Sequence, residues 1–489
     1  MQSPPRRLRL TDELGVLKTP GPGHDIVRTS RLSDWLILGL GPEPAALAAS
    51  LPPDASVRYL ECPAFAEQAG EDWRVSIPPH WRAVTCFDPH DDSNVAVSQS
   101  ALRLFPGFWG PVLAALTLPQ PELTDRFPDR TVFMPASADR LIVREVAEAL
   151  GGLGYQVQSV AWEHLPSLLK EGRPDLYLSV NFSGLDTYGQ AFSLLERAGV
   201  PVAVWCVDNP FNALSGLKSQ FWKDVSLFVT DDWFIGPLKS HGARNVHHLP
   251  LAASPAFFRA ESDAPELAGK LLFVGRSAFP GRDDFFAGLK LPEAALAETA
   301  NLFARGQRPD FAWWCKRTGI ERFWPGKQAR LAALGAEEAG RLWRTAVIEA
   351  AASAGDLVLC GDDAWRSLVE ANYSLMPLVD YYGPLAGMYA SARCVVGATS
   401  PLLPRGLTQR HFDVWAAGGR LISDATPGLE LFPRELTAPI TYKTPAHVAG
   451  AVASLEEGGP ALAQAWRELI LKEHTYSHRI STILARIKA

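Results

Sequence analysis

The run PVAVWCVD at residues 201–208 decides the fold class of this chain. Its apolar residues do not alternate with polar ones, which is typical of a strand buried on both faces of a parallel sheet. Similar runs precede and follow it, and helical patterns separate them, so we expect alternating strands and helices. The other strands of this unit are expected at residues 131–136, 155–161, 176–181, 227–232 and 246–252.

The segment LLFVGR at residues 271–276 opens the same pattern a second time. Further strands of this second sheet are expected at residues 356–362, 394–399, 419–425 and 438–443. We therefore predict an α/β protein with two Rossmann-like domains that face each other across a cleft. The predicted division is an accessory N-terminal α/β region at 1–125, a first domain at 126–262, a second domain at 263–460 with a helical insert at 284–355, and C-terminal helices at 461–489.

Size and composition exclude several classes of protein. The 489 residues are too many for one hydrophobic core, and a hydrophobic content of 47% with 20% charged residues is ordinary for a globular protein. The net charge of −6 argues against a dedicated nucleic-acid binder, which needs a basic surface. No apolar stretch reaches the roughly 18 residues of a membrane span, and no signal peptide is visible. We therefore expect a cytoplasmic protein.

The spacing of cysteine and histidine predicts neither disulfides nor a metal site. The six cysteines contain no C-x-x-C pair, and most lie in apolar runs, as buried free thiols do. His247 and His248 are neighbours in an expected strand, so their side chains point to opposite faces and cannot share one ion. We expect no metal and no bound cofactor.

The accessory region contains part of a dinucleotide-binding pattern. Gly39-x-Gly41 follows an apolar strand, and Glu61 lies near the end of the next strand. The third glycine of the pattern is missing, because Pro-Glu-Pro follows Gly41. We interpret the segment as a strand-to-helix turn that binds nothing. The alternative is a dehydrogenase with its cofactor at this turn.

The loop after the first strand of the second domain suits a phosphorylated ligand. Glycine at position 275 lets the backbone approach a phosphate, Arg276 can grip it, and Ser277 adds a hydroxyl donor. The alternative is a turn with a structural role only, since glycine after a strand is common.

A second candidate lies in the segment LTQRHFDVWAAGG at residues 407–419. Thr408 is the expected N-cap of a helix that presents Gln409, Arg410 and Asp413 near its start. The positive end of a helix together with an arginine suits a diphosphate, and the carboxylate one turn later suits a ribose. The alternative is an ordinary helix start with an Arg–Asp surface pair.

A third candidate group lies at the carboxyl end of a strand in the first domain. Asp208 ends the run at residues 201–208, Asn209 and Asn212 follow it, and Pro210 fixes the turn between them. A carboxylate with two amides can contact an acceptor, and Asp186 lies at a comparable strand end. The alternative is an Asx-type turn without a ligand.

The order of these pieces resembles the spore maturation protein CgeB family. The segments that carry the resemblance are GLTQRHFDVWAAGGRLISD at 406–424, EHTYSHRI at 473–480 and the region between the two domains at 229–258. The resemblance spans roughly residues 175–485 and leaves the accessory region outside. That family is grouped with glycosyltransferases of the GT-B fold, which consists of two Rossmann-like domains.

The resemblance implies a donor site for a nucleotide diphosphate sugar, with a UDP-sugar expected. Arg410 would contact the phosphates, Asp413 the ribose, and Gly418 with Gly419 would allow close packing of helix on sheet. The last helices of the chain would cross back onto the first domain. Related retaining enzymes have two glutamates eight positions apart, whereas this chain has Arg405 and Asp413, so a retaining mechanism is not implied.

These observations together predict a metal-independent glycosyltransferase that acts on a protein, a glycan or a small molecule. Arg276 and Arg410 would neutralise the leaving diphosphate, and Asp208 would orient or deprotonate the acceptor. Two alternatives stay open, a nucleotide-sugar epimerase of the same fold and a non-catalytic nucleotide-sugar-binding protein. Tryptophans of the helical insert would stack on an acceptor sugar or form core: Trp313, Trp314, Trp324 and Trp343.

Overall fold

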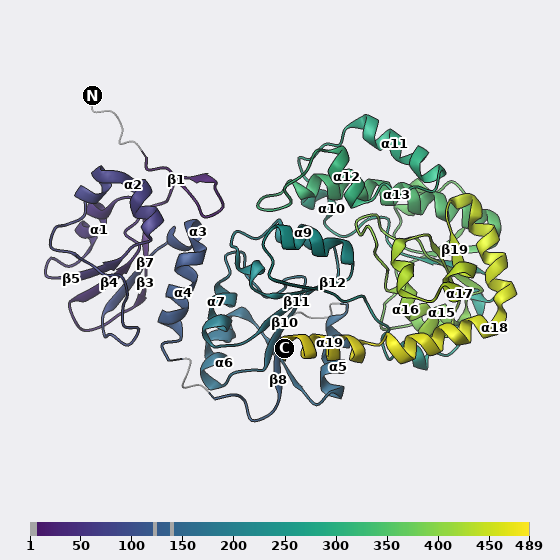
Figure 1. The fold of residues 1–489 in the computed structure, drawn as a ribbon, viewed down its shortest axis with the longest axis horizontal. Coiled ribbons are helices and arrows are strands. Elements are labelled where there is room, and N and C mark those ends of the chain that lie inside the picture. Colours follow the sequence, from purple (N-terminus) through teal and green to yellow (C-terminus); the bar gives the residue numbers. More distant parts are fainter. Residues whose placement is uncertain (1–6, 121–124, 137–140, 489) are drawn as a thin grey trace.

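The computed structural model describes residues 7–488 except 121–124 and 137–140. Residues 1–6, at the start of the predicted accessory region, lie outside the described part. Three units, each built on its own sheet, follow one another along the longest axis of the molecule (Figure 1). The accessory region lies at one end, the first Rossmann-like domain in the middle and the second at the other end. No helix among the described residues has both the length and the apolar character that crossing a membrane requires.

The accessory region holds a five-stranded sheet in the order β3-β7-β4-β5-β6. The edge strand β3 runs antiparallel to β7, and the other neighbours are parallel. A two-stranded hairpin of β1 and β2 lies beside it. The strands are β1 (Leu10–Thr11), β2 (Leu17–Lys18), β3 (His24–Arg28), β4 (Asp34–Leu38), β5 (Ser56–Leu60), β6 (Arg82–Ala83) and β7 (Asn94–Ser98), and the helices are α1 (Pro44–Ser50), α2 (Pro63–Val75), α3 (Ala101–Leu104) and α4 (Pro106–Thr117).

The glycine turn after β4 is held from within the protein. Both glycines have positive φ, 81° at Gly39 and 69° at Gly41, a conformation that other residues rarely adopt. The carboxylate of Glu61 accepts hydrogen bonds from the backbone N–H of Leu40 (2.7 Å) and of Cys62 (2.8 Å), which ties the ends of β4 and β5 together. Since both carboxylate oxygens are used in this way, the geometry favours a structural turn over a dinucleotide site.

The first Rossmann-like domain has a six-stranded parallel sheet in the order β13-β12-β11-β10-β8-β9. The run that opened the sequence analysis forms the central strand β11, whose five residues are all buried. The strands are β8 (Thr131–Pro135), β9 (Gln156–Val160), β10 (Leu176–Val180), β11 (Val202–Cys206), β12 (Ser226–Val229) and β13 (Asn245–His248), and the helices are α5 (Val143–Gly152), α6 (Leu165–Glu171), α7 (Gln190–Arg197), α8 (Pro210–Leu214) and α9 (Ile235–Ser240).

The second Rossmann-like domain has a six-stranded parallel sheet in the order β16-β15-β14-β17-β18-β19. Counted along the chain, this is the order 3-2-1-4-5-6 of a dinucleotide-binding Rossmann fold. The strands are β14 (Leu271–Val274), β15 (Leu357–Cys360), β16 (Ser374–Met376), β17 (Cys394–Val396), β18 (Leu421–Asp424) and β19 (Thr441–Tyr442), and the helices outside the insert are α14 (Trp365–Leu368), α15 (Leu385–Ser391), α16 (Arg410–Ala416) and α17 (Arg434–Thr437).

The predicted helical insert lies between β14 and β15. Its helices are α10 (Arg282–Phe285), α11 (Glu293–Ala304), α12 (Phe311–Arg317) and α13 (Ala329–Ala354). Trp314, Trp324 and Trp343 are buried at 0%, 4% and 3% exposure, and Trp313 is half-buried. Of the two roles considered for these tryptophans, the structure supports the core for the three buried ones, because no sugar ring can reach them.

Two long helices end the chain, and only the second crosses to the first domain. α18 (Val448–Glu473) packs on the second domain, where Trp466 stacks on Trp415 with ring centroids 4.8 Å apart. α19 (Tyr476–Lys488) packs against α5 of the first domain. α18 is kinked at Gly459 (φ 59°), next to the predicted boundary at residue 461, but its second half still packs on the second domain, so the crossing occurs at His474.

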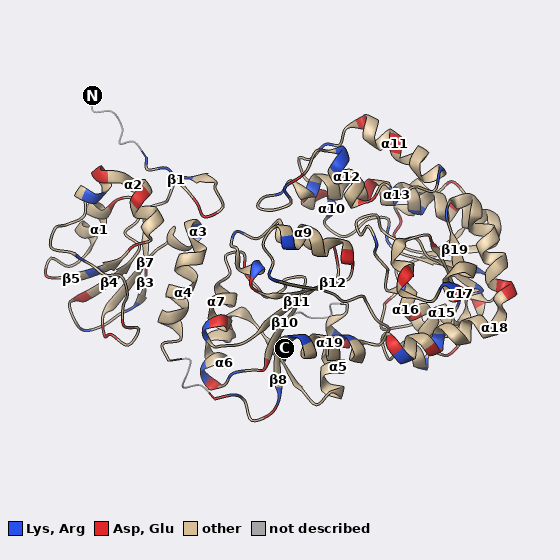
Figure 2. Ribbon diagram, viewed as in Figure 1, with Lys and Arg blue, Asp and Glu red and all other residues tan. Residues whose placement is uncertain are grey.

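These features are those of the predicted fold. Two Rossmann-like domains lie in the GT-B arrangement, the last helix of the chain returns from the second domain to the first, and a smaller α/β region precedes them. Charged residues of both signs are interspersed along the ribbon of all three units (Figure 2). All six cysteines are free thiols, and only Cys86 is exposed.

Candidate functional site

The strand order of the second domain locates a candidate ligand site. β14 and β17 are neighbours, but the chain leaves them toward opposite sides of the sheet. Ligands of open parallel sheets bind in the crevice beyond the carboxyl ends of two such strands, where helix N-termini and loops converge. The loop after β14 contains Gly275–Ser277, and the chain after β17 leads into α16. Both segments predicted for the donor therefore lie beside this point.

Arg410 and Gly275 are in direct contact there. The guanidinium of Arg410 donates from Nε (3.1 Å) and Nη2 (2.6 Å) to the carbonyl oxygen of Val274. A Cβ on Gly275 would lie 3.1 Å from Nη2, so glycine leaves the space that this arginine occupies. Burial lowers the pKa of Arg410, which nevertheless stays cationic at neutral pH. The structure thus brings together two residues that lie 135 positions apart in the sequence.

Gln409 turns toward the first domain and away from the sheet. Its Nε2 donates to the carbonyl oxygen of Ala252 (2.6 Å) in the connection between the domains. α16 begins at Arg410, with Gln409 as a cap residue whose side chain makes no capping bond. The expectation that Thr408 caps the helix was wrong, because its hydroxyl lies next to the His411 ring (3.1 Å) instead of the free N–H groups of the helix.

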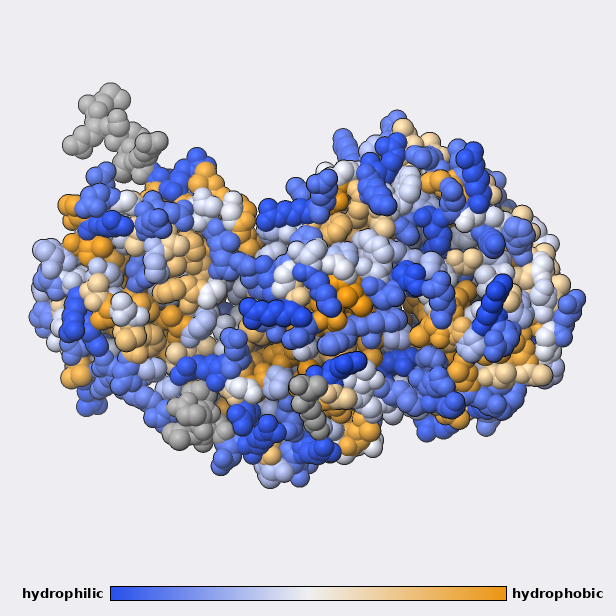
Figure 3. Space-filling view, viewed as in Figure 1, coloured by the Kyte–Doolittle hydropathy of each residue, from blue (hydrophilic) through white to orange (hydrophobic). Residues whose placement is uncertain are grey.

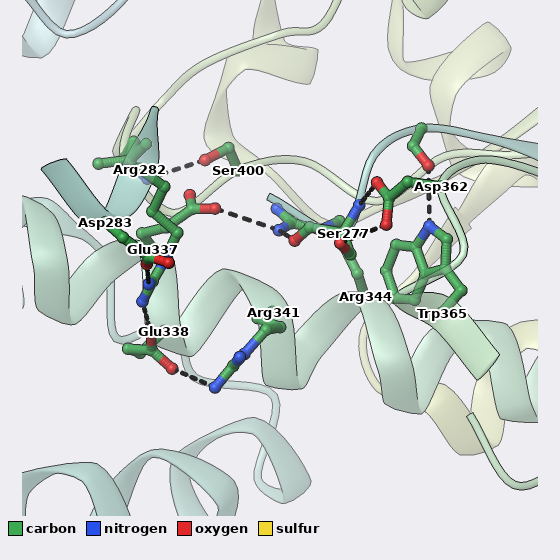
Figure 4. A network of polar contacts seen from close by, with 12 residues as sticks. Ser277, Arg282, Asp283, Glu337, Glu338, Arg341, Arg344, Asp362, Trp365 and Ser400 are labelled. Atoms are coloured by element: carbon green, nitrogen blue, oxygen red, sulfur yellow. Dashed lines mark hydrogen bonds and ion pairs between the residues drawn. The ribbon is translucent and has the colours of Figure 1, made fainter. Parts of the chain in front are cut away.

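Ser277 and Arg276 point in different directions. Ser277 is buried and donates from its backbone N–H (2.8 Å) and its hydroxyl (2.6 Å) to the carboxylate of Asp362 (Figure 4). Burial opposes ionisation of Asp362, but these hydrogen bonds outweigh it and lower the pKa of the carboxyl. Arg276 is exposed and has no hydrogen bond or ion pair within the described chain. Ser277 therefore shapes the loop, and Arg276 is free to meet a ligand.

Two further arginines near this point were not predicted from the sequence. Arg344 of α13 donates to the carbonyl oxygen of Ser277 (2.8 Å) and pairs with Glu337 (3.4 Å), as Figure 4 shows. Arg308, between α11 and α12, pairs with Asp424 at the end of β18. Arg344 also repels Arg410. The helical insert thus carries cations to the carboxyl end of the second sheet, and no sequence motif marks them.

The charge of this cluster is incompletely balanced. Among the described residues, Nε of Arg344 and both Nε and Nη2 of Arg308 are buried without a hydrogen-bond partner. Asp424, the acid nearest to Arg308, already accepts from the backbone N–H (2.9 Å) and hydroxyl (2.7 Å) of Thr399. Buried N–H groups of a cation are costly when unpaired, so an anion at this place would lower the free energy of the protein.

Asp413 lies between the two domains and is 1% exposed. It accepts hydrogen bonds from the hydroxyl of Tyr381 (2.6 Å) and the backbone N–H of Ser254 (3.2 Å). Burial outweighs these bonds and raises the pKa of Asp413 to about 8. In this conformation its carboxyl group joins the domains, and a ribose could reach it only if Tyr381 moved.

Gly418 and Gly419 lie at the opposite end of α16 from the ligand crevice. Gly418 has a φ of 77° and ends the helix in the left-handed conformation that favours glycine. A Cβ on Gly419 would overlap the carbonyl oxygen of Tyr389, so this residue packs the helix end against α15. Both glycines support the position of α16 and do not line the donor side.

Asp208 lies at the carboxyl end of β11 and keeps contact with solvent. Its Oδ2 accepts a hydrogen bond from Nδ2 of Asn181 (2.8 Å), and Oδ1 of Asn181 accepts from the backbone N–H of Val207 (2.9 Å). The surrounding protein raises the pKa of Asp208 by desolvation, although the bond from Asn181 acts in the opposite direction. A carboxyl with a raised pKa in a cleft is suited to accept a proton at neutral pH.

Asn181 is a third residue that the sequence did not identify. Asn181 and Phe182 both have positive φ, 51° and 62°, which is unusual for residues other than glycine. Strained backbone of this kind gathers at functional sites. The strain turns the chain after β10 so that the Asn181 side chain holds the Asp208 loop. Only the high tolerance of asparagine for this conformation would have been a signal in the sequence.

The other predicted acceptor-side residues have structural roles. Asn209 is 2% exposed, caps α8, and donates from Nδ2 to the carbonyl oxygen of Leu402 (3.2 Å) in the second domain. Asp186 accepts from the backbone N–H groups of Tyr188 (2.9 Å) and Ala191 (2.8 Å) at the start of α7, so neither oxygen is free. Asn212 is half-buried, and its Oδ1 has no partner among the described residues.

Arg405 bridges the two domains. It pairs with Asp232 of the first domain (2.8 Å) and Glu430 of the second (2.7 Å), and its backbone N–H donates to Asp231 (2.8 Å). Arg405, Asp232 and Glu430 line a cavity of about 270 Å³ together with His248. The position where retaining relatives have an acid thus carries a cation that holds the cleft together. Among the described residues, no cluster of three or more histidines, cysteines and acids could hold a metal ion.

Comparison with known proteins gives one match in sequence. Residues 341–485 match a family model described as glycosyl transferase-like, and no curated protein matches the chain. A solved glycosyltransferase from Rickettsia africae is 10% identical, with 74% of this chain and 98% of that chain covered at a TM-score of 0.43. Anabaena HepE in complex with UDP is 8% identical, with coverage of 73% and 99% and a TM-score of 0.44.

A third solved structure is a UDP-forming α,α-trehalose-phosphate synthase from Burkholderia vietnamiensis. It is 13% identical, with 94% of this chain and 99% of that chain covered at a TM-score of 0.37. The sequence match extends from α13 through α16 to α19. Residues 341–485, which include every strand of the second sheet except β14, are therefore similar to a glycosyl transferase-like family.

Proposed function

We propose that the chain is a CgeB-like, metal-independent glycosyltransferase that moves a sugar from a nucleotide diphosphate sugar, a UDP-sugar, to an acceptor. The observation that carries this proposal is the group of arginines around the switch point of the second sheet, within or beside the residues that match the glycosyl transferase-like model. The leaving diphosphate of such a donor is an anion that these cations can neutralise.

The second domain would stabilise the leaving group. Arg276 is exposed beside the crevice, and Arg410 lies against the same loop. Arg308 and Arg344 add buried cationic groups with unpaired N–H donors. Cations placed where negative charge develops lower the barrier to group transfer, and they cost least when they are held in place beforehand. Four guanidinium groups supply this charge without a metal.

The first domain would supply the acceptor-side base. Asp208 is the first candidate, because it lies at the carboxyl end of a central strand and its pKa is raised by desolvation. Asn181 would act as a positioning residue through its hydrogen bonds to Asp208 and Val207. The bridge from Arg405 to Asp232 would keep the two halves of the site together during the reaction.

Two measurements test this function. Nucleotide diphosphates and their sugars are compared by thermal shift, and the best ligand is then followed in a donor-hydrolysis assay. Stabilisation by UDP at millimolar concentration is expected. Absence of stabilisation by any nucleotide diphosphate would remove the main support of the proposal.

Asp208→Asn separates binding from chemistry. Donor affinity should stay within about twofold, while turnover of the donor falls by about 10²–10⁴-fold, the range typical of a lost general base. Arg410→Ala should instead abolish the stabilisation by UDP. Equal loss of UDP binding in both variants would contradict this division of roles.

A further inference from the structure

Five basic residues from three parts of the chain gather at one place on the acceptor side. Lys18 ends the β1–β2 hairpin of the accessory region, Arg103 lies in α3, Lys218 follows α8 of the first domain, and Lys327 and Arg330 precede and begin α13 in the insert. We name this set the basic groove. A cavity of about 280 Å³ between the accessory region and the first domain is lined by Lys18, Arg103 and Lys218.

The cations of the basic groove repel one another. Burial lowers the pKa of Lys218, and the nearby Lys327, Lys18 and Arg330 lower it further. Asp12 is the one acid that opposes this effect, and its Oδ1 is already used by the backbone N–H groups of Leu14 (3.0 Å) and Val16 (2.8 Å).

No residue of the basic groove forms an ion pair with another described residue. An isolated surface lysine would need no explanation, because water solvates its charge. Three of these cations, Lys18, Arg103 and Lys218, line one cavity without an ion pair among the described residues, and the field between them attracts anions. Such an arrangement is typical of a surface that binds a negatively charged ligand.

The groove borders the acceptor half of the cleft. Lys218 lies ten residues after Asp208, at the same edge of the first sheet, and its backbone N–H donates to Thr187 (2.8 Å) in the loop after β10. Arg330 reaches the same side from the insert, where its Nε donates to the hydroxyl of Ser215 (2.7 Å). The space-filling view shows the surface indented between the accessory region and the insert, above the first domain (Figure 3). The basic groove therefore includes a residue of the domain that contains Asp208.

We propose that the basic groove binds a phosphate group on the acceptor, so that the acceptor of this transferase is a phosphorylated molecule. This rests on the proposed function for its second substrate, while the phosphate site itself is independent of it. The accessory region would then serve recognition, since it contributes Lys18 and Arg103 and contains no part of the donor site. Lysine and arginine pair with phosphate through charge-assisted hydrogen bonds, which are stronger than neutral ones.

Inorganic phosphate is the probe for the test. It is titrated into the full chain by calorimetry at constant ionic strength, once alone and once with saturating UDP that occupies the donor site. Three proteins are compared: the wild type, Lys18→Met/Lys218→Met, and the control Lys170→Met/Lys290→Met, which loses the same charge from exposed positions elsewhere. We expect wild type and control to bind phosphate saturably. The groove variant should bind phosphate about tenfold more weakly, with its affinity for UDP unchanged.

Equal phosphate affinity in all three proteins, or no saturable binding at millimolar phosphate, would overturn the proposal. Lys218→Arg should retain binding, which distinguishes a lost contact from a misfolded loop. Failure of the transferase function is recognised separately, because UDP would then bind to none of the proteins whatever the phosphate titration gives.

Discussion

Arg410 and Arg276 illustrate what a sequence can say about single residues. The positions of Arg276 after β14 and of Arg410 at the start of α16 follow from the sequence pattern, since glycine and arginine at strand ends indicate a phosphate ligand. The contact between Arg410 and Val274 depends on the packing of α16 and could not be predicted. Arg308 and Arg344 were missed for the same reason: Arg308 lies in the loop between α11 and α12 and Arg344 within α13, and only the packing of the insert brings them to this site.

Arg276→Ala is expected to weaken UDP binding by about tenfold and to leave the melting temperature without ligand unchanged. The side chain is exposed and has no partner within the described chain, so its removal costs the fold nothing. Calorimetric titration with UDP and thermal melts measure the two quantities. Arg305→Ala, an exposed arginine in the insert, is the control, and an equal loss in both variants would exclude a specific role for Arg276.

Asp413 predicts a dependence of stability on pH. Its pKa of about 8 in the folded chain lies above the value of about 3.9 in an unfolded one, so the folded state holds the extra proton between these values. The protonated carboxyl therefore makes its full contribution to the free energy of unfolding below about pH 4, and this contribution is lost as the pH rises through about 8.

Asp413→Asn carries a neutral side chain at every pH and should remove this decrease. Urea unfolding at about pH 5 and about pH 9 measures the free energy of unfolding of both proteins. Relative to the wild type, the variant is expected to be more stable at the higher pH than at the lower one. A constant difference between the two proteins across this range would contradict a protonated Asp413.

At the scale of elements, α16 shows where local pattern succeeds and where it fails. Its existence and its closing glycines were predictable, because an apolar helical run followed by Gly-Gly is a stop signal. The cap at its start was not, since His411 turns its ring to Thr408 and Ser423 only in the folded domain. Similarly, tryptophans such as Trp314, Trp324 and Trp343 could stack on a sugar ring or form a core. Only their packing in the structure distinguishes the two roles.

The two glycines after α16 should respond differently to alanine. Gly419→Ala forces a methyl group into the backbone of α15 and is expected to cost about 2–3 kcal/mol of unfolding free energy. Gly418→Ala meets no atom within 4 Å and costs only the strain of a positive φ, about 1 kcal/mol. Urea unfolding compares the variants, and a larger loss at position 418 would contradict the packing described for α15 and α16.

At the scale of the whole molecule, the start of α19 is bonded to the segment that links the two domains. Arg479 is buried and donates to the carbonyl oxygens of Pro250 (2.8 Å), Leu251 (2.9 Å) and Glu473 (3.1 Å). The backbone N–H of Ala253 donates to His474 (2.8 Å) at the same point. These contacts fix where the chain crosses between domains. The sequence pattern of this tail is that of a solvated helix, so only the family resemblance predicted the crossing.

Arg479→Met should lower the unfolding free energy by about 3 kcal/mol, because it leaves several buried carbonyl groups without donors. Arg486→Met, on the exposed face of the same helix, is the matched control and should change it by less than about 0.5 kcal/mol. Urea unfolding followed by tryptophan fluorescence measures both, and similar values for the two variants would show that Arg479 holds nothing in place.

The path of α19 also sets the order in which the molecule can be completed during synthesis. The strands of the first domain leave the ribosome well before the second domain, and the helix that covers α5 and places Tyr476 against Trp205 emerges only after it. Until α19 has been synthesised, the face of that domain which buries Ile480 and Ile483 has no cover. The first domain therefore acquires its last packed helix more than 300 residues of synthesis after its first strand.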